Sequence, residues 1–120
     1  MNKYHNIKCV VDGITFHSRK EGERYKQLKL LERAGQINNL ILQPKFILLE
    51  DVLVYDINLA HANKSGIVKG IAYVADFQYD DNHFNWRTVV EDVKGVRTAV
   101  YLMKKKLFLA KYPKCIFLET

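Results

Sequence analysis

Apolar residues recur every three or four positions in two segments of the chain, and this pattern predicts two helices. The first predicted helix covers Ser18–Ala34 and is expected to stop before Gly35. Ser18 is its expected N-cap, and Glu21 stands three residues later, as a capping box requires. The second predicted helix covers Thr98–Tyr112, and the residue that follows it is a proline.

Extended segments lie before, between and after these helices. The predicted strands cover Lys8–Val11, Ile37–Leu42, Lys45–Tyr55, Ile67–Tyr79, Phe84–Lys94 and Cys115–Leu118. We expect a turn at Asp12 and Gly13, a loop over Asp56–Gly66, a bend near Gly70 and a turn over 80–83. With the short segments Lys8–Val11 and Ile37–Leu42 left aside, the order α-β-β-β-α-β predicts an α/β protein in which a central mixed β-sheet is flanked by helices.

Length and composition limit the class of protein. A chain of 120 residues, 48% hydrophobic and 27% charged, predicts one globular domain over 1–120, with 1–7 as a flexible tail. No apolar run approaches the roughly 20 residues of a membrane span. The N-terminus lacks the apolar core and cleavage site of a signal peptide. We therefore expect a cytoplasmic protein with no membrane partner, in which Cys9 and Cys115 are free thiols.

The chain carries an excess of positive charge. Lys and Arg number 19 against 13 for Asp and Glu, which gives a net charge of +6. A basic excess favours a polyanion such as nucleic acid, and solubility alone is the competing explanation. A plain solvated face is the alternative role of the lysines on the second predicted helix, and a turn is the alternative role of Gln43. The residues expected to approach DNA are Arg19, Lys20, Gln43, Lys104 and Lys105.

Acidic residues mark two neighbouring predicted strands. Asp76 interrupts an otherwise apolar stretch, and Asp92 precedes Lys94 by two positions. Because side chains alternate between the faces of a strand, Asp92 and Lys94 share one face and Glu91 points to the other. A hairpin around 80–83 would place Asp76 and Asp92 side by side. A β-bulge would exchange the roles of Glu91 and Asp92.

Two carboxylates at such close range repel one another, and a divalent cation between them removes the repulsion. Carboxylate oxygens and water suit Mg²⁺ or Mn²⁺, and a lysine on the same face can activate water or neutralise a phosphate. A surface salt bridge between Asp92 and Lys94 is the alternative. The chain has no glycine-rich phosphate loop and no nucleophile elbow, which disfavours nucleotide hydrolysis and acyl transfer.

These motifs resemble those of the PD-(D/E)XK nuclease superfamily. The matching elements are Tyr73-Val74-Ala75-Asp76-Phe77, then Asp92-Val93-Lys94-Gly95, and upstream Phe16-x-Ser18-x-x-Glu21-x-x-x-Tyr25-x-x-Leu28. Taken together, the chain from Val10 to Glu119 resembles small phage-encoded, endonuclease-like proteins. Ala75 stands where the superfamily has its nominal proline.

The resemblance implies a restriction-endonuclease-like core and a Mg²⁺-dependent DNA endonuclease, with Mn²⁺ as a substitute. Asp76 and Asp92 would be metal ligands. Glu21 and the backbone carbonyl of Val93 would complete the metal site, and Lys94 would be the catalytic lysine. Glu21 keeps the alternative role of a helix-capping residue only.

The implied reaction is phosphodiester hydrolysis in phage DNA recombination, repair or packaging, on double-stranded or branched DNA. A homodimer would suit a pair of cuts, and phage recombination or packaging proteins are further expected partners. Two other interpretations stay open. One is a DNA-binding or assembly protein without useful catalysis, and the other is a nuclease subunit that is active only within a larger complex.

Overall fold

The computed structural model of the chain describes residues 7–54, 66–93 and 97–120. The expected tail before Ile7, nearly all of the expected Asp56–Gly66 loop, and Lys94 with Gly95 lie outside the described residues. The elements, in chain order, are β1 (Cys9–Val11), β2 (Ile14–Phe16), α1 (Arg19–Arg33), β3 (Ile37–Leu42), β4 (Lys45–Leu49), β5 (Val52–Leu53), β6 (Ile67–Val68), β7 (Ile71–Val74), β8 (Phe77–Asp81), the 3₁₀ turn η1 (Asn82–Phe84), β9 (Arg87–Asp92), α2 (Ala99–Lys111) and β10 (Ile116–Glu119).

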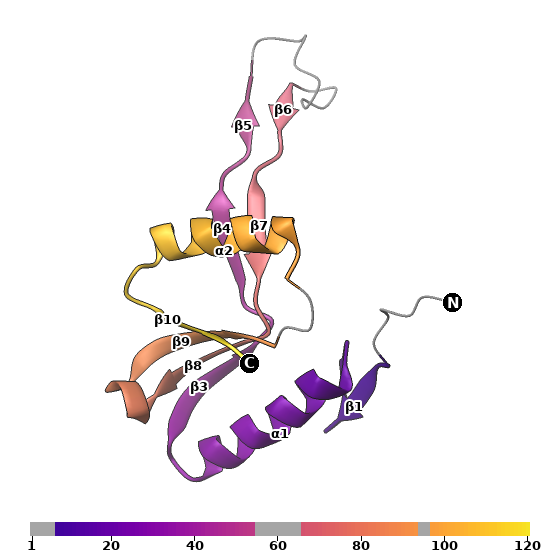
Figure 1. The fold of residues 1–120 in the computed structure, drawn as a ribbon, viewed down its shortest axis with the longest axis vertical. Coiled ribbons are helices and arrows are strands. Elements are labelled where there is room, and N and C mark those ends of the chain that lie inside the picture. The colour runs from indigo at the N-terminus through magenta and orange to yellow at the C-terminus, as the bar shows by residue number, and fades with distance from the viewer. Residues whose placement is uncertain (1–6, 55–65, 94–96) are drawn as a thin grey trace.

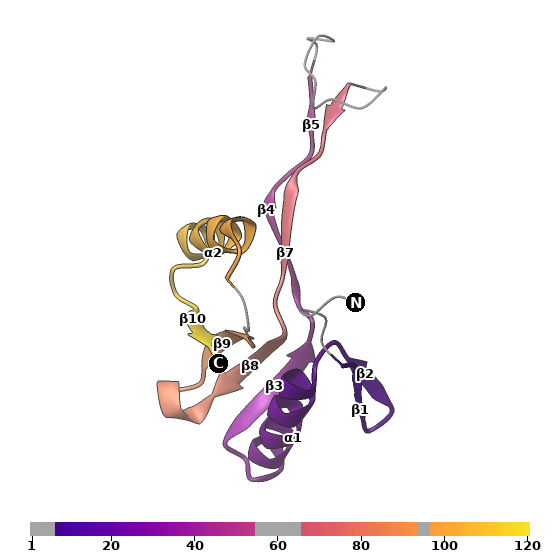
Figure 2. The ribbon, with the colours of Figure 1, turned by 45° about the vertical axis from the view of Figure 1, so that its right-hand side comes forward.

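A four-stranded mixed sheet forms the centre of the fold, in the order β10-β9-β8-β3. Strand β10 runs parallel to β9, whereas β8 pairs antiparallel with both β9 and β3. Helix α1 packs against β3 and the β1–β2 hairpin (Figures 1 and 2). The expected mixed α/β class is therefore confirmed.

Two apolar clusters lie on opposite faces of this sheet. On one face α1 supplies Tyr25 and Leu28 to a core that includes Phe77 and Val89. On the other face α2 packs against the β4–β7 ribbon, and the ring of Phe108 lies 4.9 Å from that of Phe46. Because successive residues of β9 point to opposite faces, this one strand contributes to both clusters.

The prediction of one long strand over Ile67–Tyr79 is wrong, because the chain changes strand partners there. The expected interruption near Gly70 separates β6 from β7, and a second break at Ala75 and Asp76 separates β7 from β8. The amide of Ala75 still donates to the Pro44 carbonyl, at the end of the β4–β7 ribbon. The next amide, that of Asp76, donates to the Glu91 carbonyl of the central sheet.

Other predicted boundaries also need correction. The segment Lys45–Tyr55 is divided into β4 and β5, because Glu50 and Asp51 leave the extended pairing. Strand β9 begins at Arg87 rather than Phe84, since the Asp81 carboxylate accepts from the His83 amide and caps a 3₁₀ turn. The turn expected over 80–83 is thus displaced toward the C-terminus.

The N-terminal hairpin was only half anticipated. Strand β1 and the turn at Asp12 and Gly13 agree with the expectation, but β2 was not predicted. Both predicted helices form. Ser18 caps α1 and Thr98 caps α2, each through its side-chain oxygen, which accepts from a backbone amide three residues later.

A two-stranded ribbon projects from the core. Strand β4 pairs with β7 and, farther out, β5 pairs with β6. Figure 1 shows this ribbon rising beyond α2, and the molecule measures 56 × 42 × 24 Å along its principal axes. Its radius of gyration of 17.4 Å exceeds the roughly 14 Å of a compact chain of this length. The ribbon therefore places a large surface outside the packed core.

Gly70 marks the point where the two strands of the ribbon approach most closely. A Cβ atom at this position would lie 1.9 Å from the Leu49 carbonyl oxygen, so backbone would have to move. We expect Gly70→Ala to lower the free energy of unfolding by about 1–3 kcal/mol, which urea denaturation would measure. The control is Lys69→Ala, which removes only an exposed pair with Asp51. Equal stability of the two variants would contradict the backbone clash.

Candidate functional site

Asp76 and Asp92 lie side by side where the ribbon meets the central sheet. Phe77 of β8 is paired with Glu91 of β9, and just before this pair the amide of Asp76 donates to the Glu91 carbonyl, which brings Asp76 to the end of β9 beside Asp92. Their two carboxyl groups are hydrogen-bonded to each other. The expected juxtaposition of these two acids is therefore present.

Burial sets the protonation of this pair. The Asp92 side chain is almost inaccessible, with 1% of the residue exposed, whereas Asp76 is half-buried. Desolvation, followed by the hydrogen bond and charge of Asp92, raises the pKa of Asp76 from its usual 3.8 to about 8. Near neutral pH, in the absence of a cation, Asp76 therefore keeps its proton. A ligand reaches the pair from the Asp76 side.

Both carboxyl groups are held by neighbouring donors. The amide of Val93 donates to Asp76 Oδ2 at 2.7 Å, and the hydroxyl of Tyr73 donates to Asp92 Oδ2. Burial raises the pKa of Tyr73, and the hydrogen bond to Asp92 raises it further, so the phenol stays protonated and remains a donor. The resemblance assigned the carbonyl of Val93 to a metal. The hydrogen bond from its backbone amide places Val93 beside the acidic pair.

Glu21 lies in the first turn of α1, where its amide donates to the Ser18 hydroxyl at 3.1 Å. Its negative charge is close enough to raise the pKa of Asp76. The structure therefore brings Asp76 and Asp92 together and leaves Glu21 within electrostatic range of Asp76. Glu21 thus lies in the capped first turn of α1 and also near the acidic pair, so its helix-capping role and its role in the site do not exclude each other.

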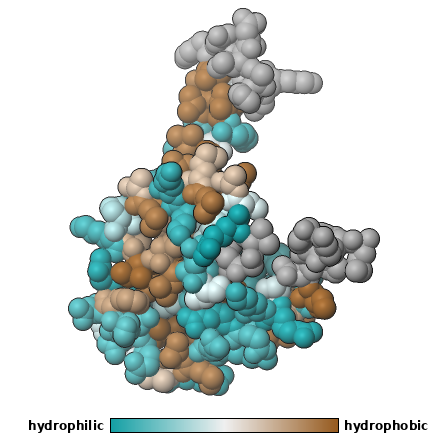
Figure 3. All heavy atoms as spheres, viewed as in Figure 1, coloured by the Kyte–Doolittle hydropathy of each residue, from teal (hydrophilic) through white to brown (hydrophobic). Residues whose placement is uncertain are grey.

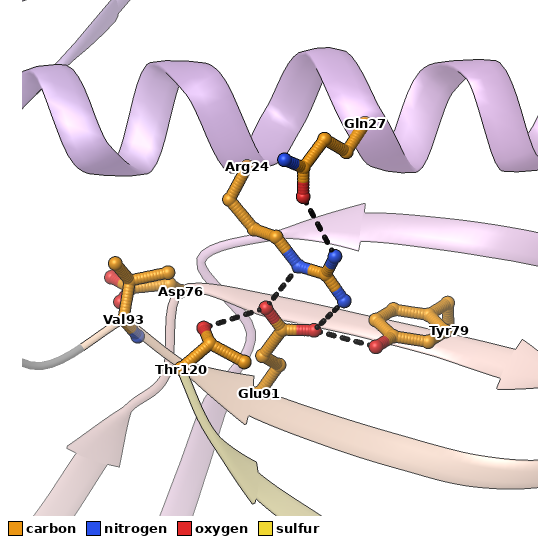
Figure 4. Close-up of polar contacts among 7 residues, drawn as sticks. All are labelled: Arg24, Gln27, Asp76, Tyr79, Glu91, Val93 and Thr120. Atoms are coloured by element: carbon orange, nitrogen blue, oxygen red, sulfur yellow. Dashed lines mark hydrogen bonds and ion pairs between the residues drawn. The ribbon is translucent and has the colours of Figure 1, made fainter.

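Glu91 points to the opposite face of β9 and is fully buried (Figure 4). Arg24 binds it with two nitrogens, at 2.5 Å for Nε to Oε2 and 2.9 Å for Nη2 to Oε1. The hydroxyls of Tyr79 and Thr120 donate to the same carboxylate at 2.5 and 2.9 Å. The hydrogen bond with Glu91 raises the pKa of Arg24. Every oxygen of Glu91 is thus engaged in holding α1, β8, β9 and the C-terminus together.

Sequence reasoning missed this network and assigned no role to Arg24. The available signal was the run Val89-Val90-Glu91-Asp92-Val93, in which two consecutive acids stand in a buried strand. Two such acids must face opposite sides, and each requires its own compensation. Nothing in the local sequence indicates that the partner of Glu91 is 67 positions away.

Within residues 7–54, 66–93 and 97–120, no three His, Cys, Asp or Glu side chains are arranged so as to hold a metal ion. The pair Asp76 and Asp92 nevertheless has suitable chemistry for a divalent cation, because a cation can replace the proton that Asp76 holds. A site built on two carboxylates would leave most of the coordination of Mg²⁺ to water.

The predicted DNA-contacting residues have different surroundings. Arg19 and Lys20 are exposed on the first turn of α1. Lys105 Nζ instead lies 2.7 Å from Glu119 and above the ring of Phe117, so its charge is largely neutralised. Lys104 is half-buried. Gln43 is exposed. Its backbone N–H donates to the Asp76 carbonyl at 3.0 Å, so its backbone helps to hold the chain beside the acidic pair.

A hollow of about 360 Å³ opens near the end of β9, on the side of α1. Its lining mixes basic, acidic and polar side chains from α1 with the ends of two strands: Lys20, Glu23, Arg24, Gln27, Val93 and Thr120. Through Val93 this hollow adjoins the Asp76 carboxyl (Figure 4). The arrangement can hold a hydrated cation at the acidic pair and an anionic group beside the first turn of α1.

Comparison with known proteins gives one family. The model for a family described as "Protein of unknown function (DUF1064)" matches residues 1–118. The chain belongs to the DUF1064 family. Neither a search of curated proteins nor a search of solved structures found a match. In the described part of this DUF1064 chain, no helix is long and apolar enough to cross a membrane.

Stability of the metal-free protein is expected to fall as pH rises from about 4 to about 8. The unfolded chain loses the Asp76 proton near the usual pKa of 3.8, whereas the folded chain keeps it up to about pH 8. Between these values the unfolded state binds fewer protons, so the free energy of unfolding decreases with pH. Urea denaturation at three pH values across this range measures the effect, and Asp76→Asn should flatten it.

The titration of Glu119 does not hide the fall in stability between about pH 4 and about pH 8. Hydrogen bonds from Lys105 and Tyr101 lower the pKa of Glu119 to about 2, so its contribution to stability is lost only at lower pH. A wild-type stability that stays constant or rises between pH 5 and pH 8 would contradict the raised pKa of Asp76.

Loss of the Arg24 guanidinium group, which pairs with Glu91, is expected to destabilise the folded protein strongly. Arg24→Met leaves a buried carboxylate without its ion pair and should lower the free energy of unfolding by about 3–5 kcal/mol. The matched control on the same helix is Lys26→Ala, which removes an exposed pair with Glu23 and should cost less than about 0.5 kcal/mol. Urea denaturation of both variants measures the difference, and similar losses would refute the structural role of Arg24.

Proposed function

We propose that this protein is a metal-dependent DNA endonuclease with a restriction-endonuclease-like core. The observation that carries the proposal is the pair of neighbouring carboxyl groups, Asp76 and Asp92, where the central sheet ends. Such a pair is costly to the metal-free fold, and a Mg²⁺ or Mn²⁺ ion offsets this cost. The third carboxylate nearby, Glu21, adds to the negative potential that attracts a cation.

The proposed ligands are Asp76 and Asp92, with Glu21 and the carbonyl of Val93 completing the set. A bound Mg²⁺ supplies Lewis acidity toward a phosphate oxygen and lowers the pKa of a coordinated water. Tyr73 and the amide of Val93 hold the two carboxyl groups in place through their hydrogen bonds. Lys94 lies outside the described residues, and its proposed role, stabilising charge on the phosphate, rests on the resemblance alone.

The proposed substrate is a phosphodiester in double-stranded or branched DNA. Its support is the net charge of +6 and the exposed side chains of Arg19 and Lys20 on the first turn of α1, of which Lys20 lines the hollow. Lys105 is a weaker candidate for a phosphate contact than the sequence suggested, because its ammonium group already forms an ion pair with Glu119. A role in phage recombination, repair or packaging, in the cytoplasm of the host and as a homodimer, completes this proposal.

The decisive experiment is cleavage of linear, nicked, flapped and four-way DNA with Mg²⁺ or Mn²⁺. Asp76→Asn and Asp92→Asn should each reduce the cleavage rate by at least about 100-fold, because each removes a charge that the cation needs. Glu23→Gln is the matched control. It changes an exposed carboxylate on α1 whose partner is Lys26, and it should leave the rate within about twofold of wild type.

Two results would count against the proposal. Cleavage that survives chelation, or that Asp76→Asn leaves unchanged, would remove the acidic pair from the reaction. Failure of the wild-type protein to cut any of the four substrates would favour the interpretation of a subunit that is active only within a larger complex. Circular dichroism of each variant separates lost activity from lost folding.

A further inference from the structure

Helix α2 carries apolar residues on its outer side as well as on the side that packs against the core. Tyr101 and Phe108 face the core and are buried. The outer side carries large apolar residues that are exposed in the described structure: Val100, Leu102, Met103, Leu107 and Leu109. Figure 3 shows brown surface interrupted by teal over the region where Figure 1 draws α2. Large exposed apolar patches that are rimmed by polar residues are typical of interaction surfaces.

The exposed residues contain a regular row. Val100, Met103, Leu107 and Ala110 are spaced by three, four and three positions, and all four are exposed. At 100° per residue they fall on one narrow stripe of the helix. This spacing is that of the a and d positions of a coiled coil, whose side chains interlock with those of a second helix. We call these four residues the α2 seam.

Lysines border the α2 seam on both sides. Lys104 and Lys106 flank Met103 and Leu107, and Lys111 follows the last position of the seam. Lys105 belongs to the other side of the helix, where it pairs with Glu119. The positions that flank a coiled-coil seam form the charge pairs that select its partner. A partner helix must therefore carry acidic residues at its own flanking positions.

A second copy of the same helix does not satisfy this requirement. Whether two α2 helices pair in parallel or antiparallel, the lysines beside one seam face the lysines beside the other. Like charges at such positions oppose association. Duplex DNA provides phosphates that can pair with the lysines. It would, however, place phosphates and base edges, and no apolar groups, against the four apolar side chains of the seam. An acidic amphipathic helix matches both the row and its borders.

We propose that the α2 seam is the docking site for an amphipathic helix of a partner protein, with apolar residues at a and d spacing and acidic residues beside them. The helix would lie along α2 and cover Met103 and Leu107 at the centre of the contact. This proposal does not depend on the nuclease assignment, because the seam lies apart from the Asp76 and Asp92 carboxyls and uses none of the residues proposed for catalysis.

The test uses a synthetic helical peptide of about three heptads, with leucine at a and d and glutamate at the flanking positions. The wild-type chain should bind it with a dissociation constant in the micromolar range. The matched variants are Leu107→Gln in the seam and Leu109→Gln outside it, two leucines that are 38% and 39% exposed. We expect at least a tenfold loss of affinity for Leu107→Gln and less than a twofold loss for Leu109→Gln, by calorimetric titration.

Each alternative occupant has its own outcome. Equal binding of a peptide with lysine in place of glutamate, equal losses in the two leucine variants, or no binding would overturn the proposal. So would a wild-type dimer in sedimentation that Leu107→Gln converts to a monomer, because a second copy would then occupy the seam. Loss of duplex DNA binding in Leu107→Gln alone would assign the seam to DNA. Circular dichroism confirms that both leucine variants keep their helices.

Discussion

The fold depends on how one buried strand accommodates two consecutive carboxyl groups. Glu91 and Asp92 are both almost fully removed from solvent, and the alternation of β9 sends them to opposite faces of the central sheet. A buried carboxylate without a partner costs several kcal/mol, so each face must supply its own compensation. The packing of α1 on one side, and of the ribbon and α2 on the other, meets this requirement in two different ways.

On the α1 face the compensation is complete. Arg24, Tyr79 and Thr120 engage both oxygens of Glu91, so this carboxylate has a structural role and joins elements that are distant in sequence. On the opposite face Asp92 accepts a hydrogen bond from the Tyr73 phenol and lies beside the carboxyl group of Asp76, which keeps its proton near neutral pH. This proton is exchangeable, and a cation can take its place. The face with two neighbouring carboxyl groups is therefore the one that can bind a cation, and the half-buried Asp76 gives access to it.

The acidic pair and the α2 seam lie on the same side of the central sheet but serve different purposes. Tyr73 contacts Asp92 and also packs against Phe108 of α2, so the helix supports the acidic pair from behind. The outer side of α2 contributes nothing to that support and remains apolar. A partner that covered α2 would therefore act on the site only through Tyr73 and its neighbours in the core.

The sequence by itself determined those features that depend on local periodicity and capping. Both helices, the mixed α/β class, the separate faces of Glu91 and Asp92, and the juxtaposition of Asp76 with Asp92 follow from spacing and from turn chemistry. Residues 94–96 lie outside the described structure, so the predicted place of Lys94 stays a prediction. Tertiary structure alone decided the break at Ala75 and Asp76, because a strand that exchanges one partner for another keeps an uninterrupted apolar pattern. It also decided the pairing of Glu91 with Arg24, since a buried charge requires a partner but local sequence does not indicate which distant cation the fold will supply.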